Sequence, residues 1–148
     1  MDENNLALGE PVVAYETGSF KHSDLTERII RIYFEVYNAL GHGFLEKVYE
    51  NAMALRLQRN GMQVRQQQPI NVFFDGQIVG DYFADLVVDD LIILELKAVE
   101  ALALEHEAQL INYLKATRYE VGLLLNFGPR PKIIRKAYAN ERKSLLAE

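Results

Sequence analysis

The sequence predicts a single α/β domain in which a mixed β-sheet is flanked by helices. Two segments between residues 24 and 60 repeat their apolar residues at the helical period. The chain then changes to strand-like patterns over residues 64–98. A strand–helix–strand sequence follows at residues 92–127, and such a unit forms a right-handed crossover between parallel strands. The sheet is therefore expected to combine this parallel pair with an antiparallel meander.

Two helices are expected at the start of the domain. The first covers residues 24–40, with Ser23 or Asp24 as its N-cap, and a Gly-His-Gly sequence ends it. The second begins near residue 45 and stops at Asn60-Gly61, a typical C-terminal signal.

Short strands are expected after the second helix. The first covers residues 64–68 and is ended by Pro69. The next two, residues 70–74 and 77–83, flank Asp75-Gly76, the strongest two-residue hairpin signal. A further pair, residues 82–88 and 92–98, has apolar runs so continuous that both faces of the sheet are expected to be covered there.

The C-terminal part is expected to hold a helix at residues 104–117, a strand at 121–127, a strand to about Ile134 and a terminal helix. Residues 130–143 carry six Lys or Arg side chains against one Glu. This segment could form a basic edge, with Arg130 and Lys132 as candidate nucleic-acid contacts, although a charge run is more often a solvated face.

The composition is that of an ordinary globular domain, residues 21–148, preceded by an N-terminal arm, residues 1–20. The net charge of −5 counts against a protein that coats DNA nonspecifically. No apolar run approaches the roughly 18 residues that cross a bilayer, and the N-terminus does not resemble a signal peptide. Because the chain has no cysteine, disulfides and thiolate metal sites are excluded. We therefore expect a cytoplasmic protein without membrane contact.

The residues that carry chemistry are Asp85, Glu95 and Lys97. Glu95 and Lys97 are two apart on a strand, so they point to the same face and place two charges in an otherwise apolar strand. A two-residue turn at Asp89-Asp90 would put Asp85 opposite Leu94. A three-residue turn, residues 89–91, puts it opposite Glu95, and we expect this second register.

Such a cluster can bind a divalent cation. Two carboxylates and a backbone carbonyl are hard oxygen ligands suited to Mg²⁺ or Mn²⁺. The ammonium of Lys97 could orient an attacking water or neutralise charge on a phosphate. The alternative is a buried Glu95–Lys97 ion pair with Asp85 as a turn or edge residue.

Two helices bring further candidates. Glu46 and Tyr49 share one face of the second helix, where Glu46 complements the helix dipole and Glu50 could serve equally well. On the helix after the Glu95 strand, Gln109 and Tyr113 share a face, and Gln109 could touch a phosphate or hold a water. His106 on the same helix is expected to be a capping or surface residue.

Several motifs, in order, resemble the GxxExxY protein family of the PD-(D/E)XK nuclease-like superfamily. They are Gly43-Phe-Leu-Glu46-Lys-Val-Tyr49, Ala84-Asp85-Leu-Val-Val, Glu95-Leu-Lys97-Ala-Val-Glu, His106-Glu-Ala-Gln109-Leu and Leu125-Asn126-Phe127. The resemblance covers roughly residues 24–138 and leaves out residues 1–20. One departure is Ala84, which stands where the superfamily motif has proline.

The resemblance implies a restriction-endonuclease-like αβββαβ core with an extra N-terminal helix. It also implies that Asp85, Glu95 and the Leu96 backbone carbonyl bind the metal, that Lys97 is the catalytic lysine and that Glu46 completes the site. Gln109 matches the polar position on the following helix.

Three functions remain open. The first is a Mg²⁺- or Mn²⁺-dependent nuclease that acts on DNA or RNA. The second is a binding module for nucleic acid or protein that keeps the nuclease fold without catalysis. The third is one subunit of a homo-oligomer or larger assembly, because little sequence outside the core is left to grip a substrate.

Overall fold

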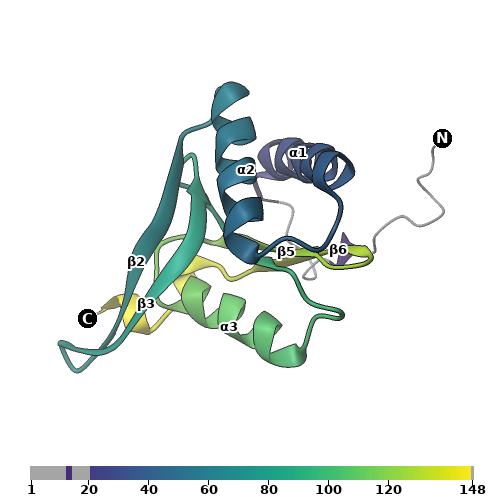
Figure 1. Cartoon of the computed structure of the whole chain (residues 1–148). Helices are drawn as coiled ribbons and strands as arrows, with labels where there is room; N and C mark the ends of the chain where they lie inside the picture. Colours follow the sequence, from purple (N-terminus) through teal and green to yellow (C-terminus); the bar gives the residue numbers. More distant parts are fainter. Residues whose placement is uncertain (1–12, 15–20, 148) are drawn as a thin grey trace.

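A six-stranded mixed sheet separates two helices on one face from a third helix on the other (Figure 1). The computed structural model describes residues 13, 14 and 21–147. In chain order the elements are β1 (Val13–Ala14), α1 (Ser23–Leu40), α2 (Glu46–Arg59), β2 (Val64–Phe74), β3 (Gln77–Val88), β4 (Ile92–Lys97), α3 (Leu104–Lys115), β5 (Val121–Phe127), β6 (Pro131–Ala137) and the 3₁₀ turns η1 (Asn140–Arg142) and η2 (Leu145–Ala147).

The element order confirms the predicted fold class. The run α2-β2-β3-β4-α3-β5 is the αβββαβ core, and α1 is the extra N-terminal helix. The strand order is β1-β6-β5-β4-β3-β2, with β4 and β5 parallel as the strand–helix–strand unit predicts. In the part of the chain that the structure describes, no helix has the length and apolar character needed to span a membrane.

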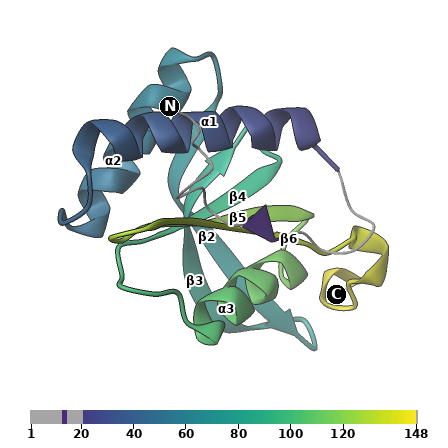
Figure 2. The ribbon, with the colours of Figure 1, turned by 90° about the vertical axis from the view of Figure 1, so that its right-hand side faces the viewer.

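The sheet buries both of its faces, in two hydrophobic cores. On β4, Ile92, Leu94 and Leu96 pack with α1 and α2, whereas Ile93 packs with α3. Because side chains alternate along a strand, Glu95 and Lys97 belong to the face that α3 covers. Figure 2 shows the same layers from the side, with α1 and α2 above the sheet and α3 below.

Pro69 does not end a strand, which corrects one prediction. Residues 64–74 form the single strand β2, in which Pro69 pairs with Phe83. The strand lies at the edge of the sheet, where half of its backbone groups have no neighbouring strand and a residue without an N–H is tolerated. The predicted strands 77–83 and 82–88 are likewise one strand, β3.

Three further expectations need correction or fall outside the structure. The predicted terminal helix is wrong, because β6 continues to Ala137 as a full-length antiparallel partner of β5 and short 3₁₀ turns follow. The first helix is not capped by Ser23 or Asp24, since it begins at Ser23 with His22 as N-cap and no side-chain cap. The predicted arm lies outside the described residues, apart from the short strand β1.

Candidate metal and phosphate site

The turn between β3 and β4 sets the register that the site requires. Val88 pairs with Ile92, so three residues form the turn, and Asp89 and Asp90 take left-handed backbone angles there. Leu86 pairs with Leu94, and one further step along this register brings Asp85 opposite Glu95. The predicted three-residue turn is therefore confirmed.

The two strands separate at Asp85, and side chains replace the missing backbone bonds. The Asp85 amide donates to Glu95 Oε2 at 2.9 Å, and the Leu96 amide donates to Asp85 Oδ2 at 2.8 Å. Each carboxylate thus takes over an N–H group that would otherwise belong to the β-ladder. The structure brings Asp85, Glu95 and the Leu96 backbone together at one point, where the sheet opens.

The opening coincides with a local reversal of the side-chain alternation in β3. Leu86 packs in the core under α1 and α2, but Ala84, two residues away, packs in the core under α3. In a regular strand both would face the same side. Opposite Asp85, between the pairs Gln66–Leu86 and Gln68–Ala84, Gln67 has a φ of 54°, a rare angle for a residue other than glycine. The hairpin therefore bends at Asp85, and this bend turns its carboxylate toward Glu95.

Burial and crowding of like charges hold protons at this site. Burial, and then the neighbouring Asp85 charge, raises the pKa of Glu95 to about 8, although the Lys97 ammonium opposes this shift. Burial also raises the pKa of Asp85, with a smaller contribution from the charge of Glu50. Glu46 acts in the same direction on both groups. Ionising both carboxyls is therefore unfavourable in the protein without a bound ion, and a cation between them would favour their charged forms.

Glu50, which the sequence offers as an alternative to Glu46, also belongs to this cluster. This residue is only 5% exposed, and its carboxylate accepts hydrogen bonds from Gln66 at 2.8 Å and Gln67 at 2.9 Å. Gln67 also donates weakly to Asp85 Oδ1 at 3.4 Å, so it bridges the two acids. Lys47 lies 3.2 Å from Glu50. Position on the second helix could not distinguish the two glutamates, because the distinction depends on the bend at Gln67.

Glu46 is the first residue of α2 and is exposed, within electrostatic range of both site carboxylates. Tyr49 holds the loop that precedes it. The buried Tyr49 hydroxyl donates to the Gly41 carbonyl at 2.6 Å and accepts from the Phe44 amide at 3.2 Å, and its ring stacks on Phe127 at 4.3 Å. Tyr49 thus fixes where α2 begins.

Basic and amide side chains form a row across the sheet beside the carboxylates. Lys97 pairs with Asn126, and Asn126 pairs with Lys132 on β6, so all three lie at one level. Adjacent strands are about 4.8 Å apart, which puts the Lys97 and Lys132 backbones about 10 Å apart. Asn126 is buried and bonds the Val99 amide and carbonyl, so it secures the chain that leaves β4.

The predicted basic edge over residues 130–143 is only partly a surface. Arg130 and Lys132 are exposed. Arg135 is buried and donates to the Lys21 carbonyl at 2.6 Å. Lys143 is also buried, and its ammonium donates to two backbone carbonyls at 2.9 and 2.6 Å, so these two cations hold the C-terminal segment in place.

Gln109 and Tyr113 lie on α3 on the same side of the sheet as Glu95. Gln109 Nε2 donates to the Tyr113 hydroxyl, and both residues line a pocket of about 510 Å³ between α3 and the β2–β3 hairpin. The charges of Glu95 and Asp85 contribute to a raised pKa of Tyr113, after burial, which places this hydroxyl within electrostatic range of the carboxylates. His106 Nδ1 accepts from the Ala103 amide at 3.0 Å, and this confirms its capping role.

The donor set fits a magnesium-type ion bound partly by water and substrate. Among the described residues, no three Asp, Glu, His or Cys side chains come together closely enough to hold a metal. Asp85 and Glu95 supply two carboxylates, and Mg²⁺ is typically bound by one or two carboxylates together with waters and substrate phosphates. A cation there would also take the place of the protons that the raised pKa values of Glu95 and Asp85 hold at the strand opening.

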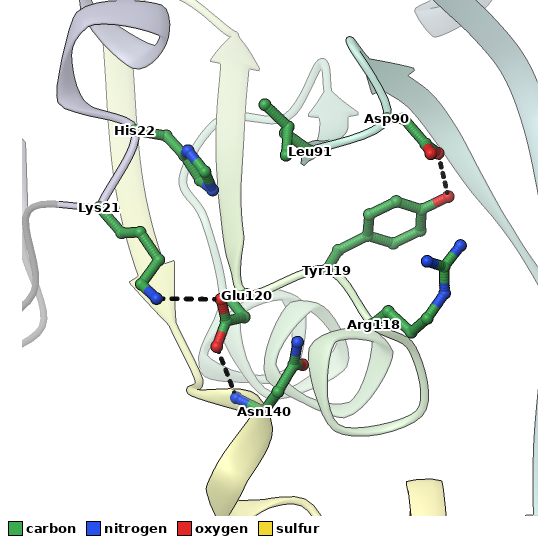
Figure 3. Close-up of a pocket in the computed structure, with 8 residues that line it drawn as sticks. All are labelled: Lys21, His22, Asp90, Leu91, Arg118, Tyr119, Glu120 and Asn140. Atoms are coloured by element: carbon green, nitrogen blue, oxygen red, sulfur yellow. Dashed lines mark hydrogen bonds and ion pairs between the residues drawn. The ribbon is translucent and has the colours of Figure 1, made fainter.

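A second pocket, of about 390 Å³, lies at the amino ends of β4 and β5 (Figure 3). Four of its polar side chains, those of Lys21, Asp90, Tyr119 and Glu120, make contacts within the pocket. Glu120 binds Lys21 at 3.2 Å and the Asn140 amide at 2.6 Å, and the Tyr119 hydroxyl lies 3.2 Å from Asp90. These contacts join the start of α1 to the C-terminal 3₁₀ turn, which is a structural role.

Comparison with known proteins identifies one family. A family profile described as the PD-(D/E)XK nuclease superfamily matches residues 23–136, from the start of α1 to β6. Neither the curated proteins nor the solved structures include a match to this chain.

Proposed function

The chain belongs to the PD-(D/E)XK nuclease superfamily, and on that basis we propose that it is a Mg²⁺- or Mn²⁺-dependent nuclease that hydrolyses phosphodiester bonds in nucleic acid, either DNA or RNA. One observation carries the proposal. The carboxylates of Asp85 and Glu95 meet where β3 and β4 separate, and Lys97 follows Glu95 on the same face of β4. Two carboxylates and one ammonium at the point where the strands separate are better explained by a site for a metal and a phosphodiester than by a buried ion pair.

In this proposal Asp85, Glu95 and the Leu96 carbonyl hold the ion, and Glu46 completes the site from the start of α2. The ion, when bound, supplies a Lewis acid for the phosphate and a lower pKa for a water. Lys97 neutralises charge on the phosphate and orients the attacking water. Gln109 holds the same water or a phosphate oxygen.

We also assign the chain to the GxxExxY family within the superfamily. The motif residues have physical roles that support this assignment. Gly43 has a φ of 115°, which favours glycine, and Tyr49 anchors the loop in front of Glu46. A cytoplasmic location, expected from the cysteine-free sequence, belongs to the same proposal.

The test separates the role of Lys97 from metal binding. Labelled single-stranded, duplex and branched DNA and RNA are incubated in Mn²⁺ with one of three proteins: wild type, Lys97→Ala or Lys21→Ala. Lys21→Ala is the control, because it removes an exposed lysine from the pocket at the opposite end of the strands. We expect Lys97→Ala to abolish cleavage while calorimetry still finds Mn²⁺ binding, and Lys21→Ala to cleave normally. Unchanged cleavage by Lys97→Ala would reject the mechanism.

A non-catalytic binding module is the second candidate. The site carboxylates already accept backbone N–H groups, and this favours a self-satisfied arrangement. That candidate predicts nucleic-acid or protein binding with no cleavage on any of the substrates above. Cleavage that EDTA abolishes would exclude it.

A further inference from the structure

We propose that the pocket between α3 and the β2–β3 hairpin binds one unpaired nucleobase of the substrate, stacked on Tyr82. This inference rests on the proposed nuclease function and names its substrate class, which is single-stranded or locally unpaired nucleic acid. The pocket has a volume of about 510 Å³ and is lined by Val72 and Tyr82 from the hairpin and by Gln109, Asn112 and Tyr113 from α3, among others. Its size is within the range of about 300–1,000 Å³ typical of small-molecule sites.

Tyr113 links the pocket to the carboxylate site. This tyrosine lines the pocket and packs in one core with Ala84, the residue before Asp85 in β3, and with Ile93 of β4. Gln109, a candidate for contact with the phosphate or the attacking water, lines the same pocket and donates to that hydroxyl. A strand whose phosphate lies at Asp85 and Glu95 would therefore carry a neighbouring base to the pocket mouth.

The lining matches the chemistry of a base. Tyr82 is 47% exposed, and its ring centroid lies 5.8 Å from that of the buried Tyr113. Tyr82 therefore offers an aromatic face at the rim of the pocket, and Tyr113 lies deeper in it. Bases stack on such faces with little dependence on sequence. The amides of Gln109 and Asn112, three residues apart on one helix, offer donors and acceptors to the edge of a base. An aliphatic occupant would leave these amides unmatched.

The geometry requires that the base be unpaired. Walls from the hairpin and from α3 stand on two sides of the pocket, and the amides would engage the base edge that pairing uses in a duplex. A fully paired duplex therefore cannot fill the pocket without extruding a base.

The chain offers a closely matched control for Tyr82. Phe83 is the next residue of β3, is 50% exposed and carries a ring of similar size, but it does not line the pocket. Tyr82→Ala removes the proposed stacking face, Tyr82→Phe keeps it, and Phe83→Ala removes an equally exposed ring from elsewhere on the hairpin. None of the three changes a residue proposed to bind metal.

The experiment titrates each protein, in EDTA, into a single strand of DNA or RNA that contains one 2-aminopurine, a fluorescent base whose emission falls when it stacks. The chain has no tryptophan to interfere. We expect quenching by wild type on at least one of the two strands. An unlabelled single strand should reverse this quenching at a lower concentration than an unlabelled duplex of the same sequence. The midpoint should rise about tenfold or more in Tyr82→Ala, from the usual contribution of base stacking, and stay unchanged in Tyr82→Phe and Phe83→Ala.

Equal midpoints for wild type and Tyr82→Ala, or equal binding of single strand and duplex, would overturn the inference. Cleavage of the same strands is then measured in Mn²⁺. Cleavage without stacking would reject the pocket and leave the nuclease intact, whereas stacking without cleavage would support the pocket and reject the nuclease.

Discussion

Glu95→Gln is expected to stabilise the metal-free protein at alkaline pH while removing its function. Glu95 is 7% exposed and accepts the Asp85 amide through Oε2. An amide side chain has nearly the same shape and can still accept that bond through its oxygen. It carries no charge, however, so the cost of burying a carboxylate next to Asp85 disappears.

The magnitude follows from the pKa of Glu95, which is raised from 4.5 in the unfolded chain to about 8 in the folded protein. Between these values the folded state binds the proton and the unfolded state does not. The stability that this proton contributes is therefore fully present below about pH 4.5 and is lost as the pH rises through 8. One proton corresponds to about 1.4 kcal/mol per pH unit, so the loss between pH 5 and pH 8 is on the order of 4 kcal/mol.

The assay is urea denaturation in EDTA at several pH values between 5 and 9, for wild type, Glu95→Gln and a control, Glu100→Gln, which changes an exposed glutamate after β4. Wild type and control should lose stability together as the pH rises, while Glu95→Gln stays flatter by roughly the amount above. The Asp85 carboxyl titrates in all three proteins. Parallel pH dependences for wild type and Glu95→Gln would refute the electrostatic account of the site.

Three further substitutions test other parts of the account. Tyr49→Phe removes both hydrogen bonds that hold the loop before α2, so the free energy of unfolding in urea should fall by about 1–3 kcal/mol, and an unchanged value would show that the loop does not need them. Gly128→Ala would place a Cβ 1.9 Å from the Val99 carbonyl oxygen, and the forced backbone shift should cost about 1–3 kcal/mol and lower the melting temperature. Glu50→Gln weakens the hydrogen bond that holds Gln67, and Gln67 in turn contacts Asp85. The cleavage rate should therefore fall roughly 10- to 100-fold with little change in the melting temperature. A normal rate would leave Glu50 without a positioning role.

Features set by neighbouring residues were predictable from the sequence. Asp75-Gly76 joins β2 and β3 with the expected two-residue loop, because Phe74 pairs with Gln77 and both loop residues take positive φ angles. Of the two turns that the sequence leaves open after β3, the three-residue turn was expected because it gathers Asp85, Glu95 and Lys97 on one face, and the structure has this turn. Helix ends marked by Asn60-Gly61 were equally local.

Features that depend on distant parts of the chain were not predictable. The left-handed angle at Gln67 lies opposite the point where β3 leaves β4, and the residues around Gln67 contain no local signal that predicts it. Glu50 is buried and bonded by Gln66 and Gln67 of β2, which lie about 16 residues further along the chain. Arg135 is part of a basic run in the sequence, but its burial depends on a carbonyl near the start of α1.

The most direct test of the central claim measures cleavage of a labelled oligonucleotide set in Mn²⁺ by wild type and by Asp85→Asn, with EDTA as a second control. The set contains single-stranded, duplex and branched forms of DNA and RNA. The account predicts that wild type cuts at least one form. It also predicts that EDTA and the Asp85→Asn substitution each stop this cleavage. Cleavage that survives Asp85→Asn, or no cleavage of any form by wild type, would contradict it.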